Sequence, residues 1–319
     1  MGRDADAERA RARRVAAIDI GTNSVLLTIA EVSDDGSLTP LVERATITRL
    51  GEGVDKTRKL ADGAIERTLA CLGEYAQAIR ESGASRLDVV GTSAMRDAAG
   101  GDTLVARAEA LLGVRPRVIS GDEEARLTFG GGLSGLSLEH AKRVIVFDIG
   151  GGSTEVIVGH RAPMRIEHAV SLDIGSVRLT ERHIRSDPPT KDELARVDED
   201  IERALDGARF DASVDAVVGV AGTVTTLGAI ARKIDPYDAA VVHGLRLSQG
   251  EVDATVALLD RTPIAERVKL PGLSPKRADV IAAGAHICRA VLARSGATEL
   301  VVSDRGVRWG LLAELAAAR

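Results

Sequence analysis

The chain contains the same kind of segment twice, and this repeat limits its fold more than any other feature. Residues 15–30 read VAAIDIGTNSVLLTIA and residues 144–159 read VIVFDIGGGSTEVIVG, so that Asp19 and Asp148 correspond. Each copy is an apolar run ending in Asp-Ile-Gly, then a turn of small residues, then a second apolar run. This order is typical of two strands joined by a tight loop. Two such copies in 319 residues predict two domains built on one plan.

The turn in each copy carries the groups that a phosphate site needs. Glycines let backbone N–H groups approach an anion, hydroxyls donate further hydrogen bonds, and the Asp at the strand end can hold a hydrated cation that bridges to phosphate. A tight turn that merely uses glycine is the alternative for a single copy, and the second copy weighs against it. No GxxxxGK[ST] motif occurs, and neither copy fits GxGxxG with a helix directly behind it, so P-loop and Rossmann folds are disfavoured.

The rest of the chain alternates helix and strand signals, which predicts an α/β architecture. Apolar residues recur at helical spacing in 61–82, and residues 86–91 are expected to form the strand that follows. The glycine-rich stretch from Gly130 to Gly135 is the best candidate for a domain boundary and hinge, although a simple loop has the same composition. Further helices are predicted from start signals at Thr190 with Glu193, at Ser248 with Glu251, and at Ser274-Pro275, the last running to about Arg294.

Two other turns combine glycine with hydroxyl residues. An apolar run meets Gly222 and Thr223 before a helical segment, which suggests an anion at a helix N-terminus, although Thr is also a common cap. Residues 91–97, GTSAMRD, end a strand and bring Ser93 and Arg96 together. Arg96 is suited either to bidentate contact with a phosphate or to a surface ion pair with Asp97 or a neighbour.

Three adjacent acids, Asp122, Glu123 and Glu124, stand just before a predicted helix. Acids in a first helical turn interact favourably with the helix dipole and need no catalytic role. Hydrolysis at two phosphate loops nevertheless requires a base to deprotonate water, and this acidic cluster lies in a strand-to-helix turn between the two loops. Both interpretations remain open from spacing alone.

Composition excludes several classes of protein. The net charge of −5 gives no general attraction for polyanions, and aromatic residues at 2% offer few rings on which bases could stack, which predicts no nucleic-acid partner. Cys71 and Cys288 lie among apolar residues and are expected in the core. Residues 1–14 are expected to form a flexible tail. Neither a signal peptide nor a membrane span is evident, so a cytoplasmic location without membrane association is expected.

Seven segments in order resemble the exopolyphosphatase and guanosine pentaphosphate phosphohydrolase (Ppx/GppA) phosphatases. The segments are DIGTNS (19–24), GTSAMRDA (91–98), ISGDEEARL (119–127), FDIGGGSTE (147–155), SLDIGSVRLTE (171–181), AGTVTTL (221–227) and PKRADVI (275–281). The resemblance implies the fold of the actin, sugar kinase and Hsp70 superfamily: two ribonuclease-H-like domains with the active site in the cleft between them. The domains are then expected at residues 1–132 and 133–319.

The resemblance also implies roles for individual residues. Glu124 matches the catalytic glutamate that activates water, and Glu123 would be its neighbour. Arg96 matches a substrate-contacting arginine. The metal-linked carboxylates, expected to bind Mg²⁺ or Mn²⁺, are Asp19, Asp148 and Glu155. The residues expected to bind phosphate are Gly21, Thr22, Asn23, Ser24, Ser93, Arg96, Gly150, Gly151, Gly152, Ser153, Thr154, Gly222 and Thr223.

Release of orthophosphate from the ends of inorganic polyphosphate is the leading functional hypothesis, with hydrolysis of the 5′-γ-phosphate of pppGpp as its close rival. A sugar kinase of the same superfamily is less consistent with GDEEA, and a zinc-containing branch needs more than two cysteines. A polyphosphate or alarmone sensor with little turnover is the third class. Dimerisation is common in the family, and the apolar stretch 311–318 suits either a core helix or part of a homodimer interface.

Two positions depart from the family pattern. Leu26 stands where many relatives carry Arg or His, and Trp309 in Arg308-Trp309-Gly310 stands where Glu is usual. A basic contact near the first loop and the role of that Glu are therefore in doubt. The chain resembles the short form without a C-terminal helical extension, which predicts a preference for shorter polyphosphate or lower processivity.

Overall fold

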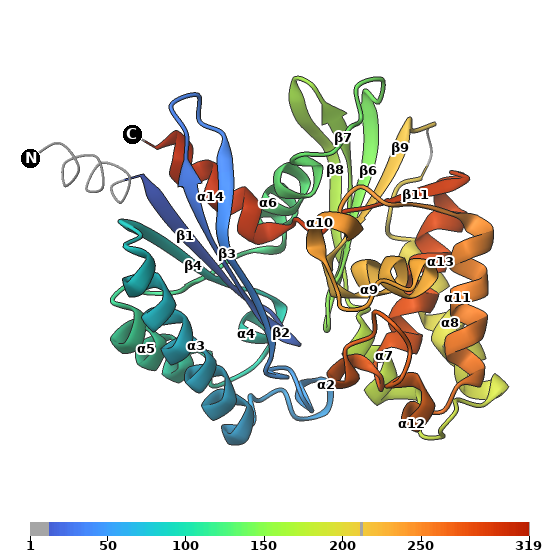
Figure 1. Ribbon diagram of the computed structural model, residues 1–319. Helices are drawn as coiled ribbons and strands as arrows, with labels where there is room; N and C mark the ends of the chain where they lie inside the picture. The colour runs from blue at the N-terminus through green and yellow to red at the C-terminus, as the bar shows by residue number, and fades with distance from the viewer. Residues whose placement is uncertain (1–12, 211–212, 319) are drawn as a thin grey trace, which may run out of the picture. The chain divides into compact units, whose positions relative to one another are not determined.

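The computed structural model describes residues 13–210 and 213–318. They form two compact units, one of residues up to Leu127 together with residues from Val307 onward, and one of Thr128–Gly306. Each unit is built around one β-sheet that carries helices (Figure 1). Helix α6, Gly121–Leu133, begins in the first unit and ends in the second.

The first sheet has the strand order β3-β2-β1-β4-β5. Strands β1 and β2 form the first predicted hairpin, with Asp19 opposite Leu26, and β4 runs parallel to β1. The elements are β1 (Arg14–Ile20), β2 (Ser24–Val32), β3 (Leu38–Ile47), α2 (Val54–Thr57), α3 (Asp62–Ser82), β4 (Arg86–Gly91), α4 (Ser93–Asp97), α5 (Gly101–Leu112), β5 (Arg117–Val118) and α14 (Val307–Ala317).

The second sheet repeats this order with one strand added, as β10-β11-β9-β6-β7-β8. Strands β6 and β7 form the second hairpin, with Asp148 opposite Glu155, and β9 runs parallel to β6. The elements are β6 (Arg143–Ile149), β7 (Thr154–Arg161), β8 (Met164–Leu172), α7 (Ser176–His183), α8 (Lys191–Leu205), β9 (Ala216–Val220), α9 (Ala221–Arg232), α10 (Ala239–Val242), β10 (Arg246–Ser248), α11 (Gln249–Arg261), α12 (Ile264–Arg267), the 3-10 turn η1 (Pro275–Arg277), α13 (Ile281–Ser295) and β11 (Glu299–Val302).

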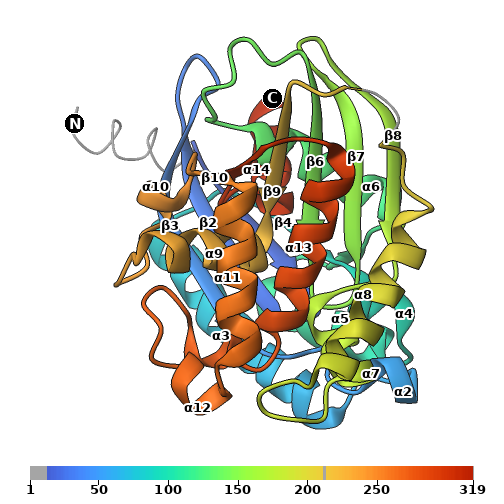
Figure 2. The ribbon, with the colours of Figure 1, turned by 90° about the vertical axis from the view of Figure 1, so that its right-hand side faces the viewer.

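Each sheet buries an apolar core that fixes the loops at its strand ends. In the first unit, apolar residues of α3 and α5 pack on β1 and β2, while α14 covers β1 and β2 with a second cluster. In the second unit, α13 packs between α11 and α8 over the sheet (Figure 2). Strands β1 and β6 are buried over most of their length, as continuous apolar runs in a covered sheet should be.

The units differ from the predicted domains in two places. The predicted division at residues 132 and 133 lies at residues 127 and 128, and residues 307–319 group with the first unit. The cause is α14, whose Leu311 and Leu312 are fully buried among residues of the first sheet. This part of the apolar 311–318 stretch therefore forms core. Residues 1–12 of the predicted tail lie outside the described residues, and Arg14, predicted to belong to that tail, begins β1.

Most of the predicted helices and strands are confirmed. Helix α3 and strand β4 match the expected ranges within a residue, and both capping boxes, at Thr190 and Ser248, are present with reciprocal hydrogen bonds. The helix expected from Ser274-Pro275 is instead a 3-10 turn followed by the separate helix α13. Both cysteines are buried and free, and burial raises the pKa of Cys288 to about 12.

The prediction of a hinge or loop at Gly130–Gly135 was wrong for most of the stretch, because Gly130 to Gly132 belong to α6. At Gly132 the absence of a side chain permits close packing. A Cβ at Gly132 would lie 2.9 Å from Val220 Cγ1 and 3.1 Å from Val146 Cγ1, so glycine lets the helix approach β6 and β9. Only Gly135, after the helix, has a positive φ, of 72°. Among the described residues, no helix is long and apolar enough to cross a membrane.

Candidate functional site

The first loop, residues 21–24, closes the β1–β2 hairpin with a hydrogen bond from Gly21 N to Ser24 O of 3.0 Å. Its carbonyl groups are occupied by the segment after β3. Thr48 N and Arg49 N donate to Asn23 O at 3.1 and 3.0 Å, and Gly51 N donates to Thr22 O at 2.8 Å. Asn23 is buried, and its Nδ2 has no hydrogen-bond partner among the described residues. An unsatisfied buried amide beside such a loop is suited to an anionic ligand.

The second loop, residues 150–153, has the same closure, from Gly150 N to Ser153 O at 3.0 Å. Its carbonyls accept from the start of α7, whose first N–H groups have no partner within the helix. Ser176 N donates to Gly150 O at 3.0 Å, and Val177 N and Arg178 N donate to Gly151 O at 2.9 and 3.0 Å.

The close approach of α7 to the second loop requires Gly175. A Cβ at this position would lie only 2.4 Å from Gly151 O. The second loop also buries its hydroxyls. Ser153 is 4% exposed, and Thr154 Oγ1 donates to Ile174 O at 2.7 Å.

These contacts orient the peptide groups of both loops. In a planar trans peptide, the carbonyl of one residue and the N–H of the next point in opposite directions. Carbonyls held against α7 therefore direct the N–H groups of Gly151 and Gly152 away from that helix, and no hydrogen bond from either N–H is formed within the described chain. The same argument applies to the N–H of Asn23 in the first loop. Successive N–H groups presented in this way form a concave site for an anion.

The three predicted metal carboxylates are distributed unequally. Asp148 and Glu155 face each other across β6 and β7, whereas Asp19 faces Leu26 across β1 and β2. Glu155 is 1% exposed, and its Oε1 accepts from Ser171 Oγ at 2.7 Å. Within the described residues, no group of three or more His, Cys, Asp or Glu side chains is placed to hold a metal. Mg²⁺ commonly needs only one or two carboxylates, because it keeps waters and binds substrate phosphates, so the Asp148–Glu155 pair fits this ion.

The third glycine-hydroxyl turn lies at the start of α9, directly after β9. Thr223 is buried, and Ala221 has a φ of 67°, a left-handed conformation that is strained for a residue other than glycine. The guanidinium of Arg277 lies so close to Gly222 that a Cβ there would be 2.0 Å from Nη1. Arg277 belongs to the PKRADVI segment, to which sequence analysis assigned no role.

The GTSAMRD segment forms the end of β4 and helix α4. Ser93 is buried and its Oγ donates to Asp97 Oδ2 at 3.3 Å. Arg96 Nη1 donates to Ile119 O at 3.1 Å and to Glu124 Oε2 at 2.9 Å. The structure therefore brings Arg96 and Glu124, two of the predicted site residues, into direct contact within the first unit. Asp97, the alternative ion-pair partner, is farther, at 3.7 Å from Arg96 Nε.

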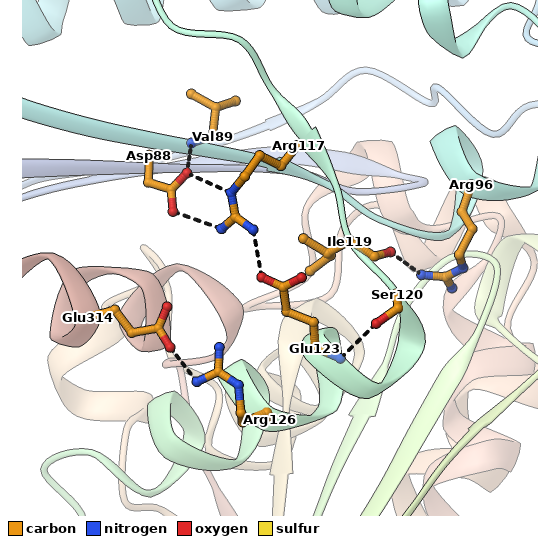
Figure 3. A network of polar contacts seen from close by, with 9 residues as sticks. All are labelled: Asp88, Val89, Arg96, Arg117, Ile119, Ser120, Glu123, Arg126 and Glu314. Carbon is orange, nitrogen blue, oxygen red and sulfur yellow. Dashed lines mark hydrogen bonds and ion pairs between the residues drawn. The ribbon is translucent and has the colours of Figure 1, made fainter.

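Glu124 and Glu123 have different surroundings although they are adjacent. Glu124 is 6% exposed, whereas Glu123 is half-buried and its Oε1 accepts from Arg117 Nη1 at 2.6 Å. Arg117 also pairs with Asp88, and the hydrogen bonds that it donates to Asp88 and Glu123 raise its pKa. Figure 3 shows Glu123 directed at Arg117, while Arg96 reaches the carbonyl of Ile119. The carboxylate of Glu123 is thus committed to an ion pair that joins α6 to β5.

The two family departures have different consequences. Leu26 occupies, in the first hairpin, the position that Glu155 occupies in the second. Trp309 is 2% exposed and packs in the apolar cluster with Val15 and Ala17. Its indole therefore contributes to the core of the first unit.

Sequence reasoning missed the segments that hold the loops. Leu50-Gly51 follows β3 and contacts the first loop, as Ile174-Gly175 follows β8 and contacts the second. An aliphatic residue followed by glycine after the third strand of each copy is the signal that identifies them. These pairs are 124 positions apart and the hairpins are 129 positions apart, so the two signals do not align in one repeat.

Comparisons with known proteins identify the family of the chain. A model of the Ppx/GppA phosphatase family matches residues 28–318. Exopolyphosphatase 2 of Mycobacterium tuberculosis is 37% identical over 318 residues, which are 95% of this chain and 98% of the relative. Guanosine-5′-triphosphate,3′-diphosphate pyrophosphatase of Photobacterium profundum is 29% identical, over 94% of this chain and 59% of that protein.

A solved structure of an exopolyphosphatase-like protein is 36% identical and has a TM-score of 0.90, over 95% of this chain and 99% of that one. The predicted α/β fold class, with two domains of the actin, sugar kinase and Hsp70 type, is confirmed. The predicted position of the active site between the domains stays a prediction.

Proposed function

The chain belongs to the Ppx/GppA phosphatase family, and from this premise we propose that it is an exopolyphosphatase, which releases terminal orthophosphate from inorganic polyphosphate. The relative named Exopolyphosphatase 2 matches 95% of this chain. The observation that carries the proposal is the shared closure of the two loops, whose carbonyls are bound so that the N–H groups of Asn23 in one loop and of Gly151 and Gly152 in the other are directed toward an anion. The phosphoryl groups of such a substrate are anions of the kind that such loops bind.

Each loop binds a phosphoryl group through its N–H groups and neighbouring side chains in this proposal. The first loop supplies Thr22, Asn23 and Ser24, with the buried amide of Asn23 as a side-chain donor. The second loop supplies Gly151, Gly152 and Ser153. Because the net charge is −5, the affinity for a polyanion must come from such local donors and not from the overall field of the protein.

Glu124 is the proposed general base. Its carboxylate accepts the proton of the attacking water as the water oxygen forms a bond to the terminal phosphorus and the bond to the bridging oxygen breaks. The guanidinium of Arg96, 2.9 Å from Glu124 Oε2, orients that carboxylate. The low exposure of Glu124 restricts competing water molecules. Glu123 has no part in this step, because Arg117 holds its carboxylate.

Asp148 and Glu155 are the residues proposed to hold Mg²⁺ or Mn²⁺, and Asp19 is the corresponding carboxylate of the first hairpin. When bound, a divalent cation would neutralise charge on the phosphoryl oxygens. The buried hydrogen bond from Ser171 keeps one oxygen of Glu155 fixed, so that its carboxylate has a defined orientation toward such an ion.

The second candidate function is hydrolysis of the 5′-γ-phosphate of pppGpp. It is favoured by the relative named for activity on guanosine-5′-triphosphate,3′-diphosphate, which matches 94% of this chain. The same residues serve both reactions because each releases a terminal phosphoryl group to water.

Orthophosphate release by the purified protein with Mg²⁺ tests the proposal. Polyphosphates of several lengths and pppGpp are compared at equal concentration of terminal phosphate, with Glu124→Gln and the matched neighbour Glu123→Gln. We expect release from polyphosphate that falls by at least about 10³-fold in Glu124→Gln and by less than about 3-fold in Glu123→Gln. Preference for pppGpp would favour the second candidate. Binding of either compound without release would identify a sensor and refute both hydrolase proposals.

A further inference from the structure

The second loop is held by two different kinds of hydrogen bond. The carbonyls of Gly150 and Gly151 accept from backbone N–H groups of α7, at 2.9 to 3.0 Å, and Gly150 O also accepts from Ser176 Oγ at 3.2 Å. The carbonyl of Gly152 accepts from a side chain, Arg178 Nε, at 2.6 Å. The orientation of the Gly152–Ser153 peptide is therefore set by one guanidinium.

The surroundings of Arg178 suit this task. Arg178 is 7% exposed and lies in the first turn of α7. Its own backbone N–H donates to Gly151 O. Its Nη2 lies 3.8 Å from Asp173 Oδ1, an exposed carboxylate that adds little to its position. A buried, planar guanidinium with fixed donors holds a carbonyl in one direction better than a flexible ammonium does.

The orientation of the Gly152–Ser153 peptide decides whether an N–H group or a carbonyl oxygen faces the ligand. With Gly152 O against Arg178, the N–H of Ser153 points the opposite way, on the same side as the N–H groups of Gly151 and Gly152. Glycine at 152 permits the reversed peptide, which would present a carbonyl oxygen to a phosphoryl group and repel it. The first loop has no such dependence, since only backbone N–H groups donate to Thr22 O and Asn23 O in the described chain.

We propose that Arg178 is a positioning residue for phosphoryl hydrolysis, which fixes the Gly152–Ser153 peptide so that the N–H of Ser153 faces the terminal phosphoryl group. This inference rests on the proposed function, because it assigns that group to the second loop. Arg178 acts through the loop and is not itself a group that touches the substrate.

The test compares Arg178→Met, which keeps bulk but has no donor, with Arg178→Lys and with Arg182→Met as the matched control. Arg182 lies one turn later on α7 and pairs with Asp200, away from the loop. We expect kcat on polyphosphate to fall by about 10- to 100-fold in Arg178→Met, less than the 10²- to 10³-fold caused by removing a donor outright. Arg178→Lys should recover part of the loss and Arg182→Met should change kcat by less than about 3-fold.

A second readout does not need turnover. The ¹⁵N-labelled amide of Ser153 should shift when orthophosphate is added to wild type, and this shift should be lost in Arg178→Met while the amide of Asn23 in the first loop still responds. Wild-type kcat and a wild-type Ser153 response in Arg178→Met would overturn the inference. If Arg178→Met does not fold, Arg178→Lys decides: a kcat reduced at least about 3-fold supports the inference, and an unchanged kcat overturns it. Absence of phosphate release by wild type refutes the proposed function instead.

Discussion

Replacing Gly175 by alanine is expected to disable the second loop while leaving most of the molecule folded. A Cβ at this position would lie 2.4 Å from Gly151 O, 2.5 Å from Gly151 C and 2.7 Å from Gly152 C. All three atoms are backbone, so no side chain can rotate out of the way. The φ of −157° and ψ of 163° at Gly175 suit alanine, so that the strain comes from the contact alone.

The magnitude follows from the hydrogen bonds that the contact displaces. Relieving the overlap requires a movement on the order of 1 Å between α7 and the loop, and three backbone hydrogen bonds of 2.9 to 3.0 Å span that gap. Overpacking costs about 1–3 kcal/mol and each weakened hydrogen bond up to about 1 kcal/mol, which suggests a loss of about 2–4 kcal/mol in the free energy of unfolding. A displacement of about 1 Å in a substrate-positioning group lowers the rate on the order of 10²-fold.

The assay measures kcat and KM for polyphosphate together with urea unfolding, at a temperature where the variant is folded. Gly250→Ala is the matched control: this glycine lies in α11 of the same unit, and a Cβ there meets nothing within 4 Å. Alanine there should raise the free energy of unfolding by about 0.5–1 kcal/mol and leave kcat unchanged. If Gly175→Ala keeps wild-type kcat and stability, the close packing of α7 on the second loop does not control activity and the argument fails.

Two further predictions concern stability. His286 is 2% exposed, and its ring nitrogens hydrogen-bond Asp198 and Asp260 at 2.6 and 3.0 Å; burial lowers its pKa, but these bonds and charges outweigh burial and raise it. A raised pKa in the folded state stabilises the protein fully below pH about 6.5, and this stabilisation is lost as the pH rises through the raised pKa. His286→Gln should therefore lower the free energy of unfolding by about 1–3 kcal/mol at pH 6, and urea titrations should show a smaller loss at alkaline pH. Trp309→Glu, which restores the usual family residue, should destabilise the first unit by at least about 3 kcal/mol in the same titration, because it buries a carboxyl group among Val15, Ala17 and their neighbours. Unchanged midpoints would show that Trp309 is not a core residue.

The repeat in the sequence predicts more of the fold than any propensity does. The two Asp-Ile-Gly segments identify both hairpins, and the structure places them at the same position in two sheets of the same strand order. Helix α3 and the capping boxes are predictable because they depend on interactions between residues only a few positions apart. The helical conformation of Gly130 to Gly132 was not predicted because glycine disfavours an isolated helix, whereas at Gly132 close packing on β6 and β9 outweighs propensity.

In the candidate site, too, some features are predictable from local sequence and others depend on tertiary contacts. The glycines and hydroxyls of the loops follow from the motif, but their N–H orientation depends on contacts with Gly51 and with α7, which are distant in sequence. The sequence alone does not distinguish the environments of Glu123 and Glu124. Only the position of Arg117 on β5 and Arg96 on α4 separates an ion-paired residue at the sheet edge from a buried carboxylate beside a guanidinium.

The two hairpins share a backbone but not a charge pattern, and this difference carries chemical information that the repeat alone does not. Asp148 faces Glu155, so the second hairpin places two carboxylates beside its loop, whereas Asp19 faces Leu26 and the first hairpin has one. Two adjacent carboxylates repel each other unless a cation or a proton lies between them, so the second hairpin is the better place for a divalent ion. The first loop compensates with Asn23, whose buried amide is a neutral donor that needs no cation to accept an anion. Under the proposed function, one shared hairpin geometry with different side chains would therefore supply two different kinds of phosphate contact.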